Sequence, residues 1–317
     1  MRKILITSLI MPFLILSCVT KGKFKIMEKS VQVEEVKEVG EVEEVEEDKE
    51  KKESKETEET TEKKEEKEIK KEVKKVEEVK KAKEEARKIR KIENKAFNIG
   101  EKFTFAIECL GITGGIATIE VKELVKVDGH LTYHLITTTK SLPVVSMFYR
   151  VNDVVESYID FDGIFSRKLI KSLREGNHLS DVTLFFDQGK NIVKQVEKNK
   201  ELVYNIPEYC QDILSCFYYF RAQKIEVGKD IFIDVHADGQ NHKLQVKVIK
   251  KEKIKTPLGK YEAFVIKPFM QFESIFKQEG DVTLWVSADE KHLPLLMKSK
   301  VFVGSVNAKL IDAVVVK

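Results

Sequence analysis

Catalytic and metal-binding patterns are absent from this sequence of 317 residues, which has 4 cysteines, 6 histidines and one tryptophan. It contains no nucleophile elbow, no zinc-protease helix and no cysteine–histidine pairing at a recognisable spacing. His236 and His242 flank a turn, but two histidines without a firm third ligand give little support for a zinc site. We therefore expect no catalytic residue, no metal and no cofactor, and we predict that the protein is not an enzyme.

A hydrophobic run long enough to cross a membrane as a helix is also missing. The longest apolar stretch, Ile4–Leu16, has 13 residues, whereas a spanning helix needs about 20. Two basic residues precede this stretch, as in the leader of an exported protein. The leader therefore predicts export, and the remaining question is how it ends.

The leader ends in "ILSC", which resembles the bacterial lipobox at Ile15 and Ser17, although Leu16 is bulkier than usual at its position. The resemblance implies removal of a signal peptide at residues 1–17 and lipidation of Cys18. Three acyl chains make a durable anchor, because each buried methylene contributes about 0.8 kcal/mol. An ordinary secretory peptide or an uncleaved anchor is the alternative. Val19, by the sorting rule of enteric bacteria, favours the outer membrane.

The charges are unevenly distributed along the chain. Residues 28–96 hold 21 basic and 25 acidic residues in 69 positions, too few apolar groups to offset the entropy of folding. From Ile69 to Ile92, apolar residues recur at steps of three and four, which is a helical spacing. We interpret residues 18–96 as a low-complexity tether, disordered to helical, and either a lone charged helix or a weak coiled coil fits it.

Residues 97–317 have a period of two instead, which is typical of strands with one wet face. Asp-Gly pairs at 128, 162 and 238 separate alternating runs and predict hairpin turns. Gly114-Gly115 predicts a bulge or bend. About a dozen strands with short connections indicate one large, strongly curved antiparallel sheet, either a half-barrel or barrel-like. The net charge of this region, near +2, gives no sign of nucleic-acid binding.

One segment, "PEYCQDILSCFYYFRAQ", breaks the strand pattern and predicts a helix near residues 208–222. Asp212 and Ser215 are residues that stabilise the first turn of a helix, and Arg221 could bind the carbonyl groups of its last turn. Alternatively, the helix gates an apolar cavity, and its ligand-contacting residues would be Phe217, Tyr218, Phe220 and Arg221, joined by Trp285.

Cysteines six apart on one helix cannot bridge, so Cys109, Cys210 and Cys216 are predicted to be buried thiols, with a Cys109 disulfide as the alternative.

The segments "QDILSCFYYFRAQKIEVGKDI" and "GDVTLWVSADEKHLPLLMKSKVFVGSVNAKL" resemble the bacterial envelope family called domain of unknown function 3108. "NIGEKFTFAIECLGITGGIATIEV" is similar to that family's first hairpin, and Cys216 departs from the smaller residue expected there. The likeness spans roughly residues 97–317. It implies an exported, β-rich and commonly lipid-anchored protein without an established activity.

Two functions fit these observations. The first is an envelope lipoprotein on the periplasmic face that binds a hydrophobic or amphiphilic envelope molecule in the concave sheet. The second is an assembly or scaffold lipoprotein that docks another envelope protein or a polysaccharide exporter. A carrier needs a dry cavity beneath the 208–222 helix, whereas a scaffold needs a filled interior and an exposed apolar patch.

Overall fold

The computed structural model describes residues 90–271, 282–300 and 305–316. These residues form one antiparallel sheet of 14 strands with two short helices, α2 (Pro143–Ser146) and α3 (Ser215–Arg221). The strands are β1 (Lys102–Cys109), β2 (Ile112–Val127), β3 (His130–Ser141), β4 (Asn152–Asp160), β5 (Ser166–Glu175), β6 (His178–Asp187), β7 (Ile192–Glu197), β8 (Lys200–Asn205), β9 (Ile231–Ala237), β10 (Gln240–Thr256), β11 (Gly259–Gln271), β12 (Val282–Ser287), β13 (Pro294–Lys300) and β14 (Ser305–Val314). The predicted leader, Cys18 and most of the predicted tether lie outside the described residues.

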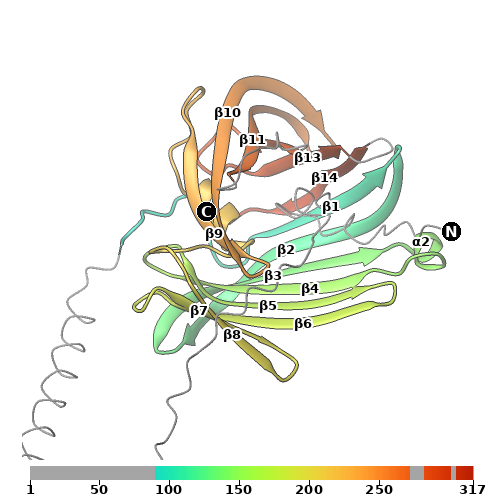
Figure 1. Ribbon diagram of the computed structural model, residues 1–317. Helices are drawn as coiled ribbons and strands as arrows, with labels where there is room; N and C mark the ends of the chain where they lie inside the picture. Colours follow the sequence, from blue (N-terminus) through green and yellow to red (C-terminus); the bar gives the residue numbers. More distant parts are fainter. Residues whose placement is uncertain (1–89, 272–281, 301–304, 317) are drawn as a thin grey trace, which may run out of the picture. The chain divides into compact units, whose positions relative to one another are not determined.

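The strand order places the first and last strands side by side in the middle of the sheet. It runs β8-β7-β6-β5-β4-β3-β2-β1-β14-β13-β12-β11-β10-β9, so β1 pairs with β14 and the edges are β8 and β9. Every other pair of neighbouring strands is consecutive in the sequence, including β3 and β4, which are joined by the connection that contains α2. Residues 206–230, which include α3, carry the chain from one edge strand to the other (Figure 1).

The sheet curves until its two edges approach each other at one end without forming a ladder among the described strands. Asn241 donates a hydrogen bond to the carbonyl oxygen of Asn205 at 2.7 Å, and Lys171 pairs with Asp238 at 3.2 Å. These contacts join the β9–β10 turn to β5 and to the end of β8. The prediction of a mainly β fold with a strongly curved antiparallel sheet is thereby confirmed.

The predicted turns also form. Asp128 and Asp238 have φ of 48° and 50°, and the glycines after them have φ of 82° and 74°, as tight hairpin turns require. The turn at Asp162-Gly163 joins β4 to β5 as expected, but there the positive φ falls on Ile164. Gly114 is the extra residue of a bulge, because Ile107 pairs with Gly115 and Glu108 with Thr113.

The helix is shorter than the predicted 208–222 range, since α3 begins at Ser215. Before it, Tyr209 has a φ of 56°, which interrupts a helix, and Gln211 forms a parallel bridge with Val235 of β9. Cys210 therefore lies on an extended segment, and the argument that it shares a helix with Cys216 was wrong. Cys109, Cys210 and Cys216 are nevertheless all free thiols, but Cys109 is only partly buried, contrary to the prediction that all three are buried.

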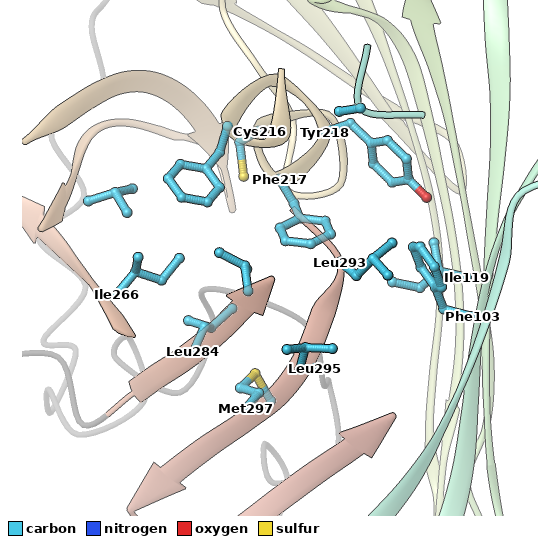
Figure 2. Packing of buried hydrophobic residues seen from close by; sticks show 14 of the residues in the cluster. Phe103, Ile119, Cys216, Phe217, Tyr218, Ile266, Leu284, Leu293, Leu295 and Met297 are labelled. Atoms are coloured by element: carbon cyan, nitrogen blue, oxygen red, sulfur yellow. The ribbon is translucent and has the colours of Figure 1, made fainter. Parts of the chain in front are cut away.

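On the concave side of the sheet, side chains from α3 and from both halves of the sheet form one buried cluster. Phe217 and Phe220 belong to the same buried cluster as Phe103 of β1, Ile266 of β11 and Leu284 of β12. Figure 2 shows Phe217 and Cys216 pointing from the helix toward the strands. A second cluster links β4–β7 to residues 206–214 and Ala237. Neither helix in the described ranges is long and apolar enough to cross a membrane.

Candidate functional site

The segment between the two edge strands carries most of the side chains expected to be functional, and Asp212 is its best-connected residue. The hydroxyls of Ser157 and Ser166 donate to Oδ2 of Asp212 at 2.7 and 2.5 Å. The backbone N–H groups of Leu214 and Ser215 donate to Oδ1 at 2.7 and 2.8 Å. Asp212 therefore joins β4 and β5 to the start of α3.

Asp212 lies just before α3, whose N-cap residue is Leu214, and its carboxylate accepts the N–H of the first helical residue, Ser215. The N–H of Asp212 donates in turn to the hydroxyl of Ser215 at 2.8 Å, which completes a reciprocal capping arrangement. Burial raises the pKa of Asp212, and the hydrogen bonds from Ser166 and Ser157 oppose that rise. The four donors are all neutral, so this carboxyl stabilises the fold without a cationic partner.

Arg221 closes the other end of α3, but it does not bind the terminal carbonyls of the helix as expected. Its guanidinium donates to both carboxylate oxygens of Glu101, at 2.6 and 2.7 Å, and to the carbonyls of Ala96 and Lys291. Burial lowers the pKa of Arg221, but the Glu101 carboxylate more than offsets this and leaves it raised. Both side chains are fully buried, so the pair fastens α3 to β1.

The aromatic residues expected to contact a ligand lie in the same core. Phe217, Tyr218 and Phe220 are 3%, 1% and 3% exposed. The ring of Tyr218 meets that of Phe97 edge-on, with centroids 4.8 Å apart. The next residue, Tyr219, is only partly buried, and its ring centroid lies 4.7 Å from the guanidinium carbon of Arg90. A ligand could contact the rings of Phe217, Tyr218 and Phe220 only if the core opened.

Trp285 lies apart from the helix residues. It alternates along β12 with the buried Leu284 and Val286, so its side chain lies on the opposite face of the strand. Its indole N–H donates to Glu252 at 2.6 Å, and the Lys298 ammonium lies 5.5 Å from the ring centroid. The structure thus brings Phe217, Tyr218, Phe220 and Arg221 together in the core, whereas Trp285 is only partly buried and packs at the margin of the same cluster. A ligand-binding role for the five remains a prediction.

The two histidines that flank the β9–β10 turn do not converge. Asn241 pairs with His236 and Val235 with His242 across the strands, so the two imidazoles lie on opposite faces. Nδ1 of His236 lies 2.8 Å from the side-chain oxygen of Asn241. Burial lowers the pKa of both histidines. In the described ranges, no group of three histidine, cysteine or acidic side chains is arranged to hold a metal ion.

A buried pair of carboxyl groups was missed from the sequence. Asp153 of β4 and Glu175 of β5 are 2% and 5% exposed, and Oδ1 of Asp153 accepts the backbone N–H of Arg174 at 2.7 Å. Burial, followed by the charge of Asp153, raises the pKa of Glu175 to about 7. Burial also raises the pKa of Asp153. The pair can therefore hold a proton near neutral pH.

No sequence signal identified this pair, because the two residues are 22 positions apart and only the β4–β5 pairing brings them together. Tyr149 covers them: both acids contribute to raising its pKa, after burial. Its ring also packs on Gly176, where an added Cβ would lie 2.8 Å from Cε2. The pair thus lies behind the connection that contains α2.

Exposed apolar side chains gather at the same end of the sheet. The β1–β2 turn and the α2 connection lie against each other, since the N–H of Leu142 donates to the carbonyl of Gly114 at 2.9 Å. Figure 1 shows both segments at one end of the strands. We call the following five residues the apolar tip: Leu110, Ile112, Val144, Met147 and Phe148, which are 69%, 72%, 70%, 81% and 87% exposed.

Comparisons with known proteins found one matching family and several solved structures with low sequence identity. The family described as "Protein of unknown function (DUF3108)" matches residues 102–311. A β-barrel-like protein of domain of unknown function DUF1849 from Brucella abortus is 9% identical, with a TM-score of 0.48, and the alignment covers 70% of this chain and 99% of that chain. No protein of curated function matches the sequence significantly.

Two further solved structures align with lower scores. One, from Bacteroides fragilis, is described as an exported protein of YmcC-like fold, and the other, from Parabacteroides distasonis, as a lipoprotein. Each is 10% identical, and the alignments cover 71% of this chain and 99% of theirs, with TM-scores of 0.30 and 0.29. The family match, in contrast, extends from the first residue of β1 into β14, so the chain belongs to the DUF3108 family of proteins of unknown function.

Proposed function

We propose that the chain is a lipid-anchored protein of the bacterial envelope whose β domain docks another envelope protein. The predicted lipid on Cys18 would hold the domain to a membrane, on the periplasmic face and at the outer membrane if the sorting rule applies. A partner from a polysaccharide-export assembly would fit the same role. The domain acts by binding in this proposal, without catalysis and without a cofactor.

The observation that carries this proposal is the buried cluster that the described residues form on the concave side of the sheet. A carrier of hydrophobic molecules requires free apolar surface inside, whereas Phe217 and Phe220 already pack against strands of both halves. Arg221 and Asp212 fix the two ends of α3 through buried hydrogen bonds. Opening the sheet to a ligand would break these contacts. Binding of a hydrophobic molecule in the concave sheet is therefore the weaker of the two hypotheses.

The β8 edge is the surface best suited to the partner. It is a terminal strand of the sheet, and Leu202 and Val203 on it are 50% and 61% exposed. An edge strand offers unpaired backbone groups to an extended segment of another protein, and Leu202 and Val203 add exposed apolar surface on opposite faces of β8. We therefore assign the docking contact to strand addition at β8.

Site-specific photo-cross-linking in cells tests this assignment. A photoreactive residue at Leu202 should yield a discrete protein adduct, whereas one at Lys122, an exposed position inside the sheet on β2, should yield none. Val203→Lys should abolish the adduct from position 202, because a lysine on an edge strand opposes pairing. Equal adducts from both positions, or an adduct that survives Val203→Lys, would contradict docking at β8.

A further inference from the structure

We propose that the apolar tip inserts into the surface of an anionic lipid bilayer. This goes beyond docking at β8, because the tip is a different surface and its occupant is lipid. The tip consists of Leu110 and Ile112 on the β1–β2 turn and Val144, Met147 and Phe148 around α2, and each is at least two-thirds exposed. The two segments are held together, so they would meet a surface as one unit.

The hydrogen bond between Leu142 and Gly114 is one of several contacts that hold the tip rigid. The Ser146 hydroxyl lies 2.6 Å from that of Ser141, and it donates to the carbonyl of Leu142 at 2.9 Å. Behind these residues, the N–H of Gly176 donates to the carbonyl of Arg150 at 2.7 Å. The backbone of the connection is thus tied to β2, β3 and the β5–β6 turn. Its apolar side chains project from a fixed base.

The exposed charge around the tip is positive. Lys140 and Arg150 flank the α2 connection and are both exposed, and residues 109–119 and 140–152 contain no acid. The nearest acid on β1, Glu108, is paired with Lys309 at 2.5 Å. This arrangement matches the layers of a bilayer. The apolar side chains at the apex would reach the acyl chains, and the basic residues behind them would lie at the level of the anionic headgroups.

The shape of the tip favours lipid over a protein partner. The five side chains stand on two separate turns, and Met147 and Phe148 are more than four-fifths exposed, so they project instead of forming a flat or grooved face. A protein would need a matching pocket for each projecting side chain. Acyl chains, which have no fixed shape, accommodate them without one.

Vesicle flotation of the chain from Cys18 onward, produced without its lipid, tests the proposal. We expect the chain to bind vesicles of phosphatidylglycerol with phosphatidylcholine, and Met147→Ser with Phe148→Ser to weaken that binding about tenfold. The matched control, Leu202→Ser with Val203→Ser, removes two exposed apolar residues from β8 and should leave binding unchanged. All variants keep the tether, so any lipid contact of its basic run cancels in the comparison.

Lys140→Gln with Arg150→Gln gives a second, electrostatic readout. This change should weaken binding to vesicles that contain phosphatidylglycerol and leave any binding to pure phosphatidylcholine unaltered. Equal flotation of the wild type, the Met147/Phe148 variant and the β8 control would overturn the proposal. So would a protein adduct, in place of a lipid adduct, from a photoreactive residue at position 148 in cells.

A fluorescence measurement keeps the test valid if the serine variant fails to fold. Phe148→Trp in a Trp285→Phe background should show a blue shift with vesicles and quenching by brominated acyl chains. Leu202→Trp in the same background should show neither. An unquenched tryptophan at position 148 would show that the tip stays in water, whatever the outcome of cross-linking at β8.

Discussion

The guanidinium of Arg221 and the carboxylate of Glu101 form a two-bond ion pair inside the core, although 120 residues separate them in the sequence. Arg221 is the last residue of α3, in the connection between the two edge strands, and Glu101 immediately precedes β1 at the middle of the sheet. Four aromatic rings lie within 6 Å of the guanidinium carbon, those of Phe97, Phe103, Phe217 and Tyr218. The pair therefore joins the helix to the centre of the sheet.

Replacing Glu101 with glutamine should strongly destabilise the fold. Arg221 would remain buried without a carboxylate, a loss of about 3–5 kcal/mol in the free energy of unfolding. Glu120→Gln is a matched control, because Glu120 pairs with Lys102 at 3.1 Å on the surface of the same hairpin, and it should cost at most about 1 kcal/mol. Urea unfolding measures both, and similar losses in the two variants would contradict the importance of the buried pair.

Asp212→Ala should also destabilise the protein, by about 3 kcal/mol, because two hydroxyls and two backbone N–H groups lose their acceptor inside the core. Asp187, which binds Lys190 in an exposed turn, provides the comparison, and Asp187→Ala should cost less than about 1 kcal/mol. Chemical denaturation monitored by far-ultraviolet circular dichroism distinguishes them. Equal unfolding midpoints for the Asp212 variant and the wild type would refute this role.

Glu175 should make stability depend on pH. Its pKa rises from 4.5 to about 7 on folding, so the neutral form is favoured in the folded state. The stabilisation is complete below pH 4.5 and is lost as pH rises through about 7. Relative to the wild type, Glu175→Gln should therefore gain about 1–3 kcal/mol between about pH 5 and pH 8. A difference that does not change with pH would show that this carboxyl titrates normally.

The three thiols of the described residues should differ in reactivity. Burial raises the pKa of Cys210 and of Cys216, whereas Cys109 is only partly buried. Since the thiolate is the reactive form, iodoacetamide should modify Cys109 in the folded protein and the other two only after denaturation. Peptide mass spectrometry locates the adducts, with Cys109→Ser as the control. Rapid modification of Cys216 in native protein would mean that the core beneath α3 is open.

The sequence was most informative where a local pattern determines the geometry. Asp128 and Gly129 predicted a hairpin because few other dipeptides tolerate two positive φ angles in succession. Gly114-Gly115 predicted a bulge or bend, and the pairing of β1 with β2 places a bulge there. Period-two alternation predicted a large antiparallel sheet, but it did not show that β8 is one of the two edge strands. The exposed pattern of β8 reflects its place at an edge, which no local signal reports.

The remaining features depend on contacts between distant segments. Asp212 was predicted as a cap from its position near a helix start, but its bonds to Ser157 and Ser166 require the β4–β5 pairing. Glu101 gave no sign of pairing with Arg221, because the pair forms only when β1 reaches the centre of the sheet. The helix was predicted too long, since its apolar spacing continues into a segment that instead bridges to β9.

Intact mass measurement of the protein extracted gently from its own envelope is the most direct test of the account. The account predicts an amino terminus at Cys18 that carries thioether-linked and amide-linked lipid, and a domain mass with no copurifying ligand. A freely soluble chain with an unmodified Cys18 thiol would contradict the anchor. A stoichiometric lipid bound to the domain, under conditions in which a known carrier keeps its own ligand, would contradict a filled interior and restore the carrier hypothesis.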